Sequence, residues 1–306
     1  MSEQYREQLS GFKSWEEKAH ASEWLVFPEN TGEYLRIDGT ALSGGELYAI
    51  LASKAAKGKK GATVAMVEGT ESEKAIEVME KIPEEKRKQV GEVTLDLSGS
   101  MRKTVRSCFP KAGRVIDRFH VQKLAYDALQ EIRIARRWDA VNEETEAMEQ
   151  AKPSNRKHEP QLPANRDSKK QLPARSRYLL FKSADKWTEK QKQGAGLLFE
   201  LYPDIRKAYS PTHALRMIFS KNRIKNAARP SLARWDNKVA ESKFKSFNTV
   251  AATVYEHYEE ILNFFINRST NASAESFNAK IKSFRAALGG VVDIDFFLFG
   301  VTKIYA

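Results

Sequence analysis

The sequence predicts an α/β protein on the basis of three observations. Short apolar runs alternate with helical patterns between residues 33 and 120, whereas strand patterns are almost absent from residues 121–267. Residues 272–288 then form an amphipathic helical pattern that ends at Gly289 and Gly290. A chain of 306 residues is also long enough for about two domains at the usual ~150 residues each. We therefore expect a sheet-containing domain with an all-helical insertion before its closing helix.

The sheet-forming region has the predicted order of three strands, helix, strand, helix and strand. The strand patterns occupy residues 34–38, 46–52, 62–68, 92–97 and 114–119, and the helical patterns occupy residues 71–82 and 101–108. Glycine-containing turns separate the first three strands, which we expect to run antiparallel.

The helical region begins with a long amphipathic pattern over residues 121–152, and a proline-containing linker at residues 153–173 follows. Further helices are expected at residues 186–202, 213–228 and 246–267. The predicted domains are an N-terminal extension (1–30), the first part of the core (31–125), a basic helical insertion (126–268) and the closing helix with its tail (269–306).

Composition excludes several classes of protein. No run approaches the ~20 apolar residues of a membrane span, and residues 1–14 lack the basic and apolar pattern of a signal peptide. The single cysteine, Cys108, excludes an internal disulfide and multi-cysteine zinc modules. We expect a cytoplasmic protein without membrane partners.

Positive charge is concentrated in the helical region. The chain has 51 Lys and Arg against 40 Asp and Glu. Residues 151–190 contain eleven basic and four acidic residues, and residues 201–250 contain eleven and three. Such clusters indicate either a polyanionic partner or a solvated surface. Trp187 and Trp235 lie in these segments; we expect them to pack in the core, with stacking on an unpaired base as the alternative.

Two aspartates are expected to end neighbouring strands. Asp38 closes Tyr-Leu-Arg-Ile-Asp and Asp96 closes Val-Thr-Leu-Asp. If these strands are parallel neighbours, the carboxylates stand side by side and repel unless a cation lies between them, and Mg²⁺ suits such oxygen ligands. Either aspartate alone is more simply explained as a cap of the following turn.

The string Asp96-Leu-Ser98-Gly-Ser100 also resembles the metal-ion-dependent adhesion motif of von Willebrand type A domains. That alternative implies a divalent-ion-dependent protein-binding module. It is the less favoured reading, because three predicted strands precede this motif.

The closing helix has one polar and one apolar stripe. Helical spacing places Asn271, Glu275, Asn278 and Lys282 on one face. The adjacent apolar stripe, which includes Phe277 and Ile281, is suited to pack on a sheet while the polar stripe faces a ligand.

At these residues the sequence resembles bacterial insertion-sequence transposases of the DDE type, specifically the ISL-three type family. The resemblance is carried by Val-Thr-Leu-Asp ending at Asp96, by Asp-Arg-Phe-His over residues 117–120 and by Thr-Asn-Ala-x-Ala-Glu-x-Phe-Asn-x-Lys-Ile-Lys from Thr270.

The resemblance implies a ribonuclease-H-like core whose acidic triad falls on Asp38, Asp96 and Glu275. These three would be the catalytic residues and would hold two Mg²⁺ (or Mn²⁺) ions ~3.5–4 Å apart around the scissile phosphate. Asp117 and His120 would lie near the active site. The residues expected to contact DNA are Asn271, Asn278, Lys280, Lys282, Arg285, Arg102 and Lys103.

The implied function is that of a transposase catalytic subunit, which cleaves transposon ends and transfers the strands into target DNA in the bacterial nucleoid. The expected partners are the inverted repeats, target DNA and further copies of the chain. Relatives carry an N-terminal DNA-binding region that is missing here, so we expect a second polypeptide to supply it, or a truncated copy. The alternative function is a catalytically inactive, domesticated DNA-binding protein.

Overall fold

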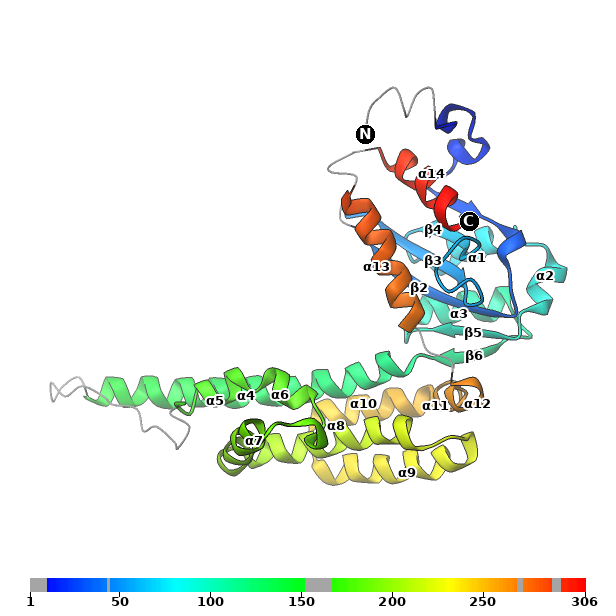
Figure 1. Ribbon diagram of the computed structural model, residues 1–306. Coiled ribbons are helices and arrows are strands. Elements are labelled where there is room, and N and C mark those ends of the chain that lie inside the picture. Colours follow the sequence, from blue (N-terminus) through cyan, green and yellow to red (C-terminus); the bar gives the residue numbers. More distant parts are fainter. Residues whose placement is uncertain (1–9, 43–44, 152–166, 269–271, 288–292) are drawn as a thin grey trace. The chain divides into compact units, whose positions relative to one another are not determined.

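The chain divides into two compact units, the first of which is built on a six-stranded mixed sheet (Figure 1). The computed structural model describes residues 10–42, 45–151, 167–268, 272–287 and 293–306, with only the backbone described for residues 272–275. The first unit comprises Met1–His120 and Glu259–Ala306, and the second comprises Val121–Tyr258. The mixed sheet with many helices confirms the α/β class.

The strands lie in the order β1-β4-β3-β2-β5-β6 across the sheet. Their bounds are β1 Trp24–Val26, β2 Tyr34–Ala41, β3 Leu47–Ser53, β4 Thr63–Glu68, β5 Glu92–Leu95 and β6 Gly113–Ile116. The pairs β1/β4, β4/β3 and β3/β2 are antiparallel, whereas β2/β5 and β5/β6 are parallel. The central strands are buried on both faces, as their nearly continuous apolar sequences require. Strand β1 lies in the region expected to be an extension and joins the sheet through β4.

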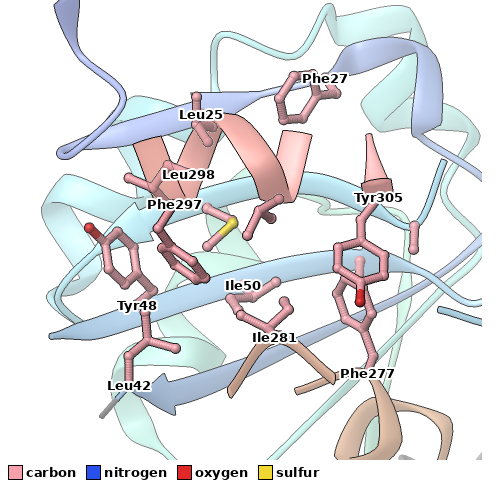
Figure 2. Packing of buried hydrophobic residues seen from close by; sticks show 14 of the residues in the cluster. Leu25, Phe27, Leu42, Tyr48, Ile50, Phe277, Ile281, Phe297, Leu298 and Tyr305 are labelled. Atoms are coloured by element: carbon pink, nitrogen blue, oxygen red, sulfur yellow. The ribbon is translucent and has the colours of Figure 1, made fainter. Parts of the chain in front are cut away.

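One face of the sheet is covered by helices from the C-terminal part of the chain. These are α13 (Ala272–Ala287) and α14 (Ile294–Tyr305). Phe277 and Ile281 of α13 and Phe297 of α14 join Tyr48 and Ile50 of β3 in one buried cluster (Figure 2). This packing brings the closing helix back to strands that precede it by more than two hundred positions in the sequence.

Helices on the other face follow β4 and β5 in the chain. They are α1 (Ser72–Met79), α2 (Glu84–Gln89) and α3 (Gly99–Cys108), and α1 contacts both β4 and α3. Helices α11 (Tyr258–Leu262) and α12 (Phe264–Asn267) lead back into this unit. The buried Glu260 of α11 pairs with Arg102 of α3 at 3.1 Å and with Arg114 of β6 at 2.7 Å, so it ties the returning chain to the sheet.

The second unit is entirely helical in its described part. Helix α4 (Arg118–Ala151) begins in the first unit and continues into the second, whose other helices are α5 (Gln171–Arg175), α6 (Arg177–Phe181), η6 (Ala184–Lys186), α7 (Glu189–Leu201), α8 (Pro203–Lys221), α9 (Lys225–Ser242) and α10 (Lys245–Glu256). No helix in the described ranges has both the length and the apolar character needed to cross a membrane.

The helix boundaries differ from the sequence expectations in three places. The pattern expected at residues 213–228 is divided between α8 and α9 at the extended residue Asn222, and both helices contain a proline, Pro211 and Pro230. The helix expected at residues 246–267 is interrupted at His257 and Asn263. Of the expected linker at residues 153–173, the part up to residue 166 lies outside the described residues, and the part from Gln171 is helical.

Truncation of Phe297 tests the docking of α14. Phe297 is fully buried and its ring centroid lies 5.7 Å from that of Phe284, so we expect Phe297→Ala to lower the free energy of unfolding by about 3–5 kcal/mol. The control is Ile304→Ala, which removes a 44% exposed side chain from the same helix. Denaturant titration measures both variants, and equal effects would show that α14 is not anchored through Phe297.

Candidate functional site

Three aspartates lie just beyond the last paired residues of the parallel strands. Arg36 of β2 pairs with Thr94 of β5, and two residues further along each chain stand Asp38 and Asp96. Leu95 of β5 pairs with Ile116 of β6, and the next residues are Asp96 and Asp117. Because side chains at paired positions of neighbouring strands point to the same face, the three carboxylates share one face of the sheet.

The aspartates differ in how they meet the strand ends. Asp96 directly follows β5, as expected, but Asp38 lies inside β2, which continues to Ala41. The extension arises because β2 pairs with β3 as far as Ala41, whereas it pairs with β5 only as far as Arg36. Asp38 therefore stands just beyond the end of the pairing with β5.

Asp38 is in an unfavourable environment for a carboxylate. Its pKa is raised, first by burial and next by the negative charge of Asp96. His120, the Gly39 backbone N–H and Arg36 act in the opposite direction with smaller effects. Asp96 and His120 are thus close enough to affect the Asp38 pKa, and the effect of Asp96 exceeds that of each cationic side chain acting on it among the described residues.

Helix α13 reaches this position through a direct hydrogen bond. The Nδ2 of Asn278 donates to Oδ2 of Asp38 at 2.7 Å, and Asn278 is only 8% exposed. Glu275 lies three residues earlier in the same helix, on the same face as Asn278 by helical periodicity. The side chain of Glu275 lies outside the described residues, so its place at the site stays a prediction.

Asp117 and His120 connect the sheet to helix α4. Asp117 is fully buried, and its Oδ1 accepts a hydrogen bond from the backbone N–H of Phe119 at 3.2 Å. Its carbonyl oxygen accepts from the backbone N–H of His120 at 3.1 Å. Asp117 therefore caps the start of α4 and positions His120, whose ring acts on Asp38.

A buried polar network that sequence reasoning missed supports the same face. The ammonium group of Lys54 lies 3.0 Å from Oε1 of Glu92 and contacts Thr94 Oγ1, and Asn267 donates to Oε2 of Glu92 at 3.0 Å. Arg36 is 2% exposed and lies over the Phe277 ring, and burial lowers its pKa to about 10. The sequence feature that could have identified this network is the occurrence of charged residues within apolar strand patterns.

The residues expected to contact DNA are divided by the structure into buried and exposed groups. Asn278 bonds to Asp38, and Arg285, which is 8% exposed, lies 2.7 Å from Glu46. Both side chains thus have partners within the protein, and their contact with DNA stays a prediction. Lys280 and Lys282 are exposed on α13, although Lys280 also donates to the Gly58 carbonyl at 3.2 Å.

The remaining predicted DNA contacts precede α13 or belong to α3. Arg102 forms the ion pair with Glu260, and Lys103 forms an ion pair with Glu73 on the surface. Asn271 lies outside the described residues. The exposed lysines of α13 are thus the best placed of the set.

The aspartate pair suits a divalent cation, although the described side chains do not form a complete site. No group of three His, Cys, Asp or Glu side chains in the described part of the chain lies close enough to hold a metal ion. Two aligned carboxylates with a raised pKa at Asp38 nevertheless match the hard oxygen ligands that Mg²⁺ and Mn²⁺ prefer.

The loop after β5 has a structural arrangement of its own. The backbone N–H of Ser98 donates to Oδ1 of Asp96 at 2.8 Å, and the hydroxyls of Ser98 and Ser100 lie 2.9 Å apart. The serines therefore form a turn that orients Asp96 at the start of α3. The four strands before this loop, β1 to β4, pair antiparallel, which agrees with the reason for which the adhesion-module alternative is less favoured.

Comparison with known families covers both units of the chain. A family model described as transposase, of the DDE, ISL-three type, matches residues 35–301. Comparisons with curated proteins and with solved structures give no match. The matched range runs from β2, which carries Asp38, to α14, and includes the helical unit. The chain therefore belongs to the ISL-three type family of DDE transposases.

Proposed function

We propose that the chain is the catalytic part of a DNA transposase, which cleaves phosphodiester bonds at transposon ends and joins the freed ends to target DNA. The observation that carries this proposal is the alignment of Asp38 with Asp96 on parallel strands, with Asn278 of α13 bonded to Asp38. Family membership supports the reaction class, and this geometry supports our proposal of where the reaction occurs.

The topology supports a ribonuclease-H-like core. Strands β2, β3 and β4 form an antiparallel series, and β5 and β6 add in parallel on the other side of β2. This arrangement has the order 3-2-1-4-5 when β2 is counted first. Helix α13 then covers the face that carries the carboxylates.

In the proposed mechanism Asp38, Asp96 and Glu275 hold divalent metal. Bound Mg²⁺ or Mn²⁺ would activate a water or a 3′-hydroxyl and stabilise the leaving oxygen. Asn278 orients the Asp38 carboxylate, and the Ser98 backbone N–H orients Asp96. His120 lies on the same side, where we propose that it contacts the scissile phosphate.

We propose that DNA is the substrate and that copies of the chain assemble on it. Lys280 and Lys282 extend from the helix that borders the site, and the second unit carries the excess of positive charge. Each of these groups of positive charge would neutralise backbone phosphates of bound DNA. We further propose that copies of the chain assemble on the inverted repeats.

The first test measures strand cleavage on labelled DNA that carries the terminal inverted repeats. Asp96→Asn keeps the size of the side chain but removes its charge, so we expect cleavage with Mg²⁺ to fall by at least about a hundredfold. Glu275→Gln should have a similar effect. The matched control is Asp127→Asn, an exposed aspartate of α4, which should cleave like the wild type.

The outcome also separates the two candidate functions. If the wild type binds the DNA but cleaves no more than Asp96→Asn, the chain is a domesticated DNA-binding protein. Cleavage that survives Asp96→Asn unchanged would remove that carboxylate from the mechanism.

A second test measures metal binding without activity. An ion that binds only the folded protein adds about 2.7 kcal/mol of stability when its concentration is one hundred times its Kd. Mg²⁺ or Mn²⁺ at such a concentration should therefore raise the midpoint of thermal unfolding of the wild type by several degrees. Asp38→Asn removes the repulsion with Asp96 and keeps an acceptor for Asn278. We expect this variant to be more stable than the wild type without metal and to gain nothing from metal.

The third test concerns the exposed lysines of α13. DNA affinity should fall steeply with salt concentration, and Lys282→Ala should reduce the slope of log K against log salt by about 1. The control is Lys88→Ala, because Lys88 lies on α2 and is paired with Glu84 at 2.6 Å. Fluorescence anisotropy at several salt concentrations measures both slopes, and equal slopes would exclude Lys282 from the DNA contact.

A further inference from the structure

The second unit contains an aromatic cavity that the proposed cleavage chemistry does not use. It has a volume of about 820 Å³ and is lined by residues of η6, α7, α8 and α9. All of these residues belong to the second unit, so the cavity is complete within it. Its size is in the range of small-molecule and nucleotide sites.

Aromatic rings form one wall of this cavity. The ring centroids of Trp187 and Tyr209 are 5.5 Å apart, and Phe199 lies 5.4 Å from Tyr209. His213 packs on Tyr209 at 4.0 Å. Burial lowers the pKa of His213, which favours the neutral imidazole. The wall is therefore uncharged and presents ring surfaces.

The polar atoms of the two central rings are already used by the protein. The indole N–H of Trp187 donates to the carbonyl of Leu179 at 3.1 Å, and the hydroxyl of Tyr209 donates to the carbonyl of Lys182 at 2.8 Å. These bonds fix the orientation of the two rings, both of which line the cavity. A ligand would thus be recognised by stacking and not by hydrogen bonds to these atoms.

The rim of the cavity is basic. Arg206 of α8 and Lys238 of α9 line it and are exposed, and neither forms an ion pair with any residue in the part of the chain that the structure describes. Lys192, which is paired with Glu189 at 2.6 Å, also lines the cavity, and Glu200 is the one acidic residue among the described residues that line it. A ligand with a flat aromatic ring and a negatively charged backbone complements such a site.

We propose that this cavity binds an unpaired nucleobase of DNA, with the base stacked on the Trp187 and Tyr209 wall and its phosphates beside Arg206 and Lys238. The proposal rests on the proposed function, in which DNA with unpaired ends is the substrate. A paired base is excluded because its faces are covered by its neighbours in the helix, whereas an unpaired base exposes a face to the wall. Stacking without hydrogen-bond readout predicts little preference for base identity.

The test compares two tryptophans of the same unit. Binding of a short fluorescein-labelled oligothymidylate is measured by anisotropy at fixed salt, in an Asp96→Asn background that does not cut DNA. Trp187→Ala should weaken binding roughly tenfold or more, since stacking contributes on that scale. Trp138→Ala, which removes a tryptophan that is 59% exposed on α4, should leave the affinity unchanged.

Further variants separate stacking from folding and from charge. Trp187→Phe keeps a ring and should restore most of the affinity, and circular dichroism checks that Trp187→Ala remains folded. If it does not, Arg206→Ala with Lys238→Ala carries the test, because both side chains are exposed: single-strand affinity and its salt slope should both fall. Binding of blunt duplex DNA should change much less in the tryptophan variants.

The possible results are distinct. Equal affinities for Trp187→Ala and Trp138→Ala, or equal losses on single-stranded and duplex DNA, would overturn the base site. Failure of the proposed cleavage is read separately, from wild-type protein on terminal-repeat DNA. A protein that does not cleave but loses single-strand binding in Trp187→Ala would still possess the base site.

Discussion

The parallel pairing of β2 with β5 is the constraint on which the candidate site depends. Hydrogen bonds between the two strands fix their register, and the register in turn fixes Asp38 beside Asp96. Leu35 and Val93 are paired and fully buried, so a slip by one residue would place apolar side chains on the wrong face and turn one carboxylate away from the other. The apolar core of the sheet thus determines the acidic pair, although neither aspartate contributes to that core.

Asn278, the residue of α13 that contacts Asp38, is placed at the site by helix packing and not by strand pairing. Helix α13 is held by Phe277 and Ile281 in the cluster with β3 and α14, and the polar face beside them delivers Asn278 to Asp38. The chain leaves the sheet after β6 and returns through α11, where Glu260 is tied to α3 and β6. The chain is thus held to the sheet both where it leaves, at β6, and where it returns, at α11. The first unit therefore keeps its geometry although a large helical unit occupies the sequence between these two points.

Much of the sheet could be predicted because its strands are apolar runs separated by glycine turns, and the family was recognised from short strings around Asp96 and Glu275. Strand β1 was missed because three residues are too few to show a period. Helices α8 and α9 were misplaced because each contains a proline. For the site, the α13 pattern identified a polar stripe but did not distinguish buried Asn278 from exposed Lys282, since that depends on the packing partner.

The placement of positive charge around Asp38 explains why we propose metal, and not a protein cation, as the partner of the acidic pair. Lys54 is engaged by Glu92, and Arg36 lies over Phe277. Among the groups that influence the Asp38 pKa, Arg36 has the smallest effect, while Asp96 is second only to burial. Lys54 and Arg36 therefore take part in contacts with Glu92 and Phe277 and do not neutralise the charges of the aspartate pair. A divalent ion can neutralise the two carboxylates and still bind the phosphate of the substrate. A lysine in the same place would form a lasting ion pair with the carboxylates instead.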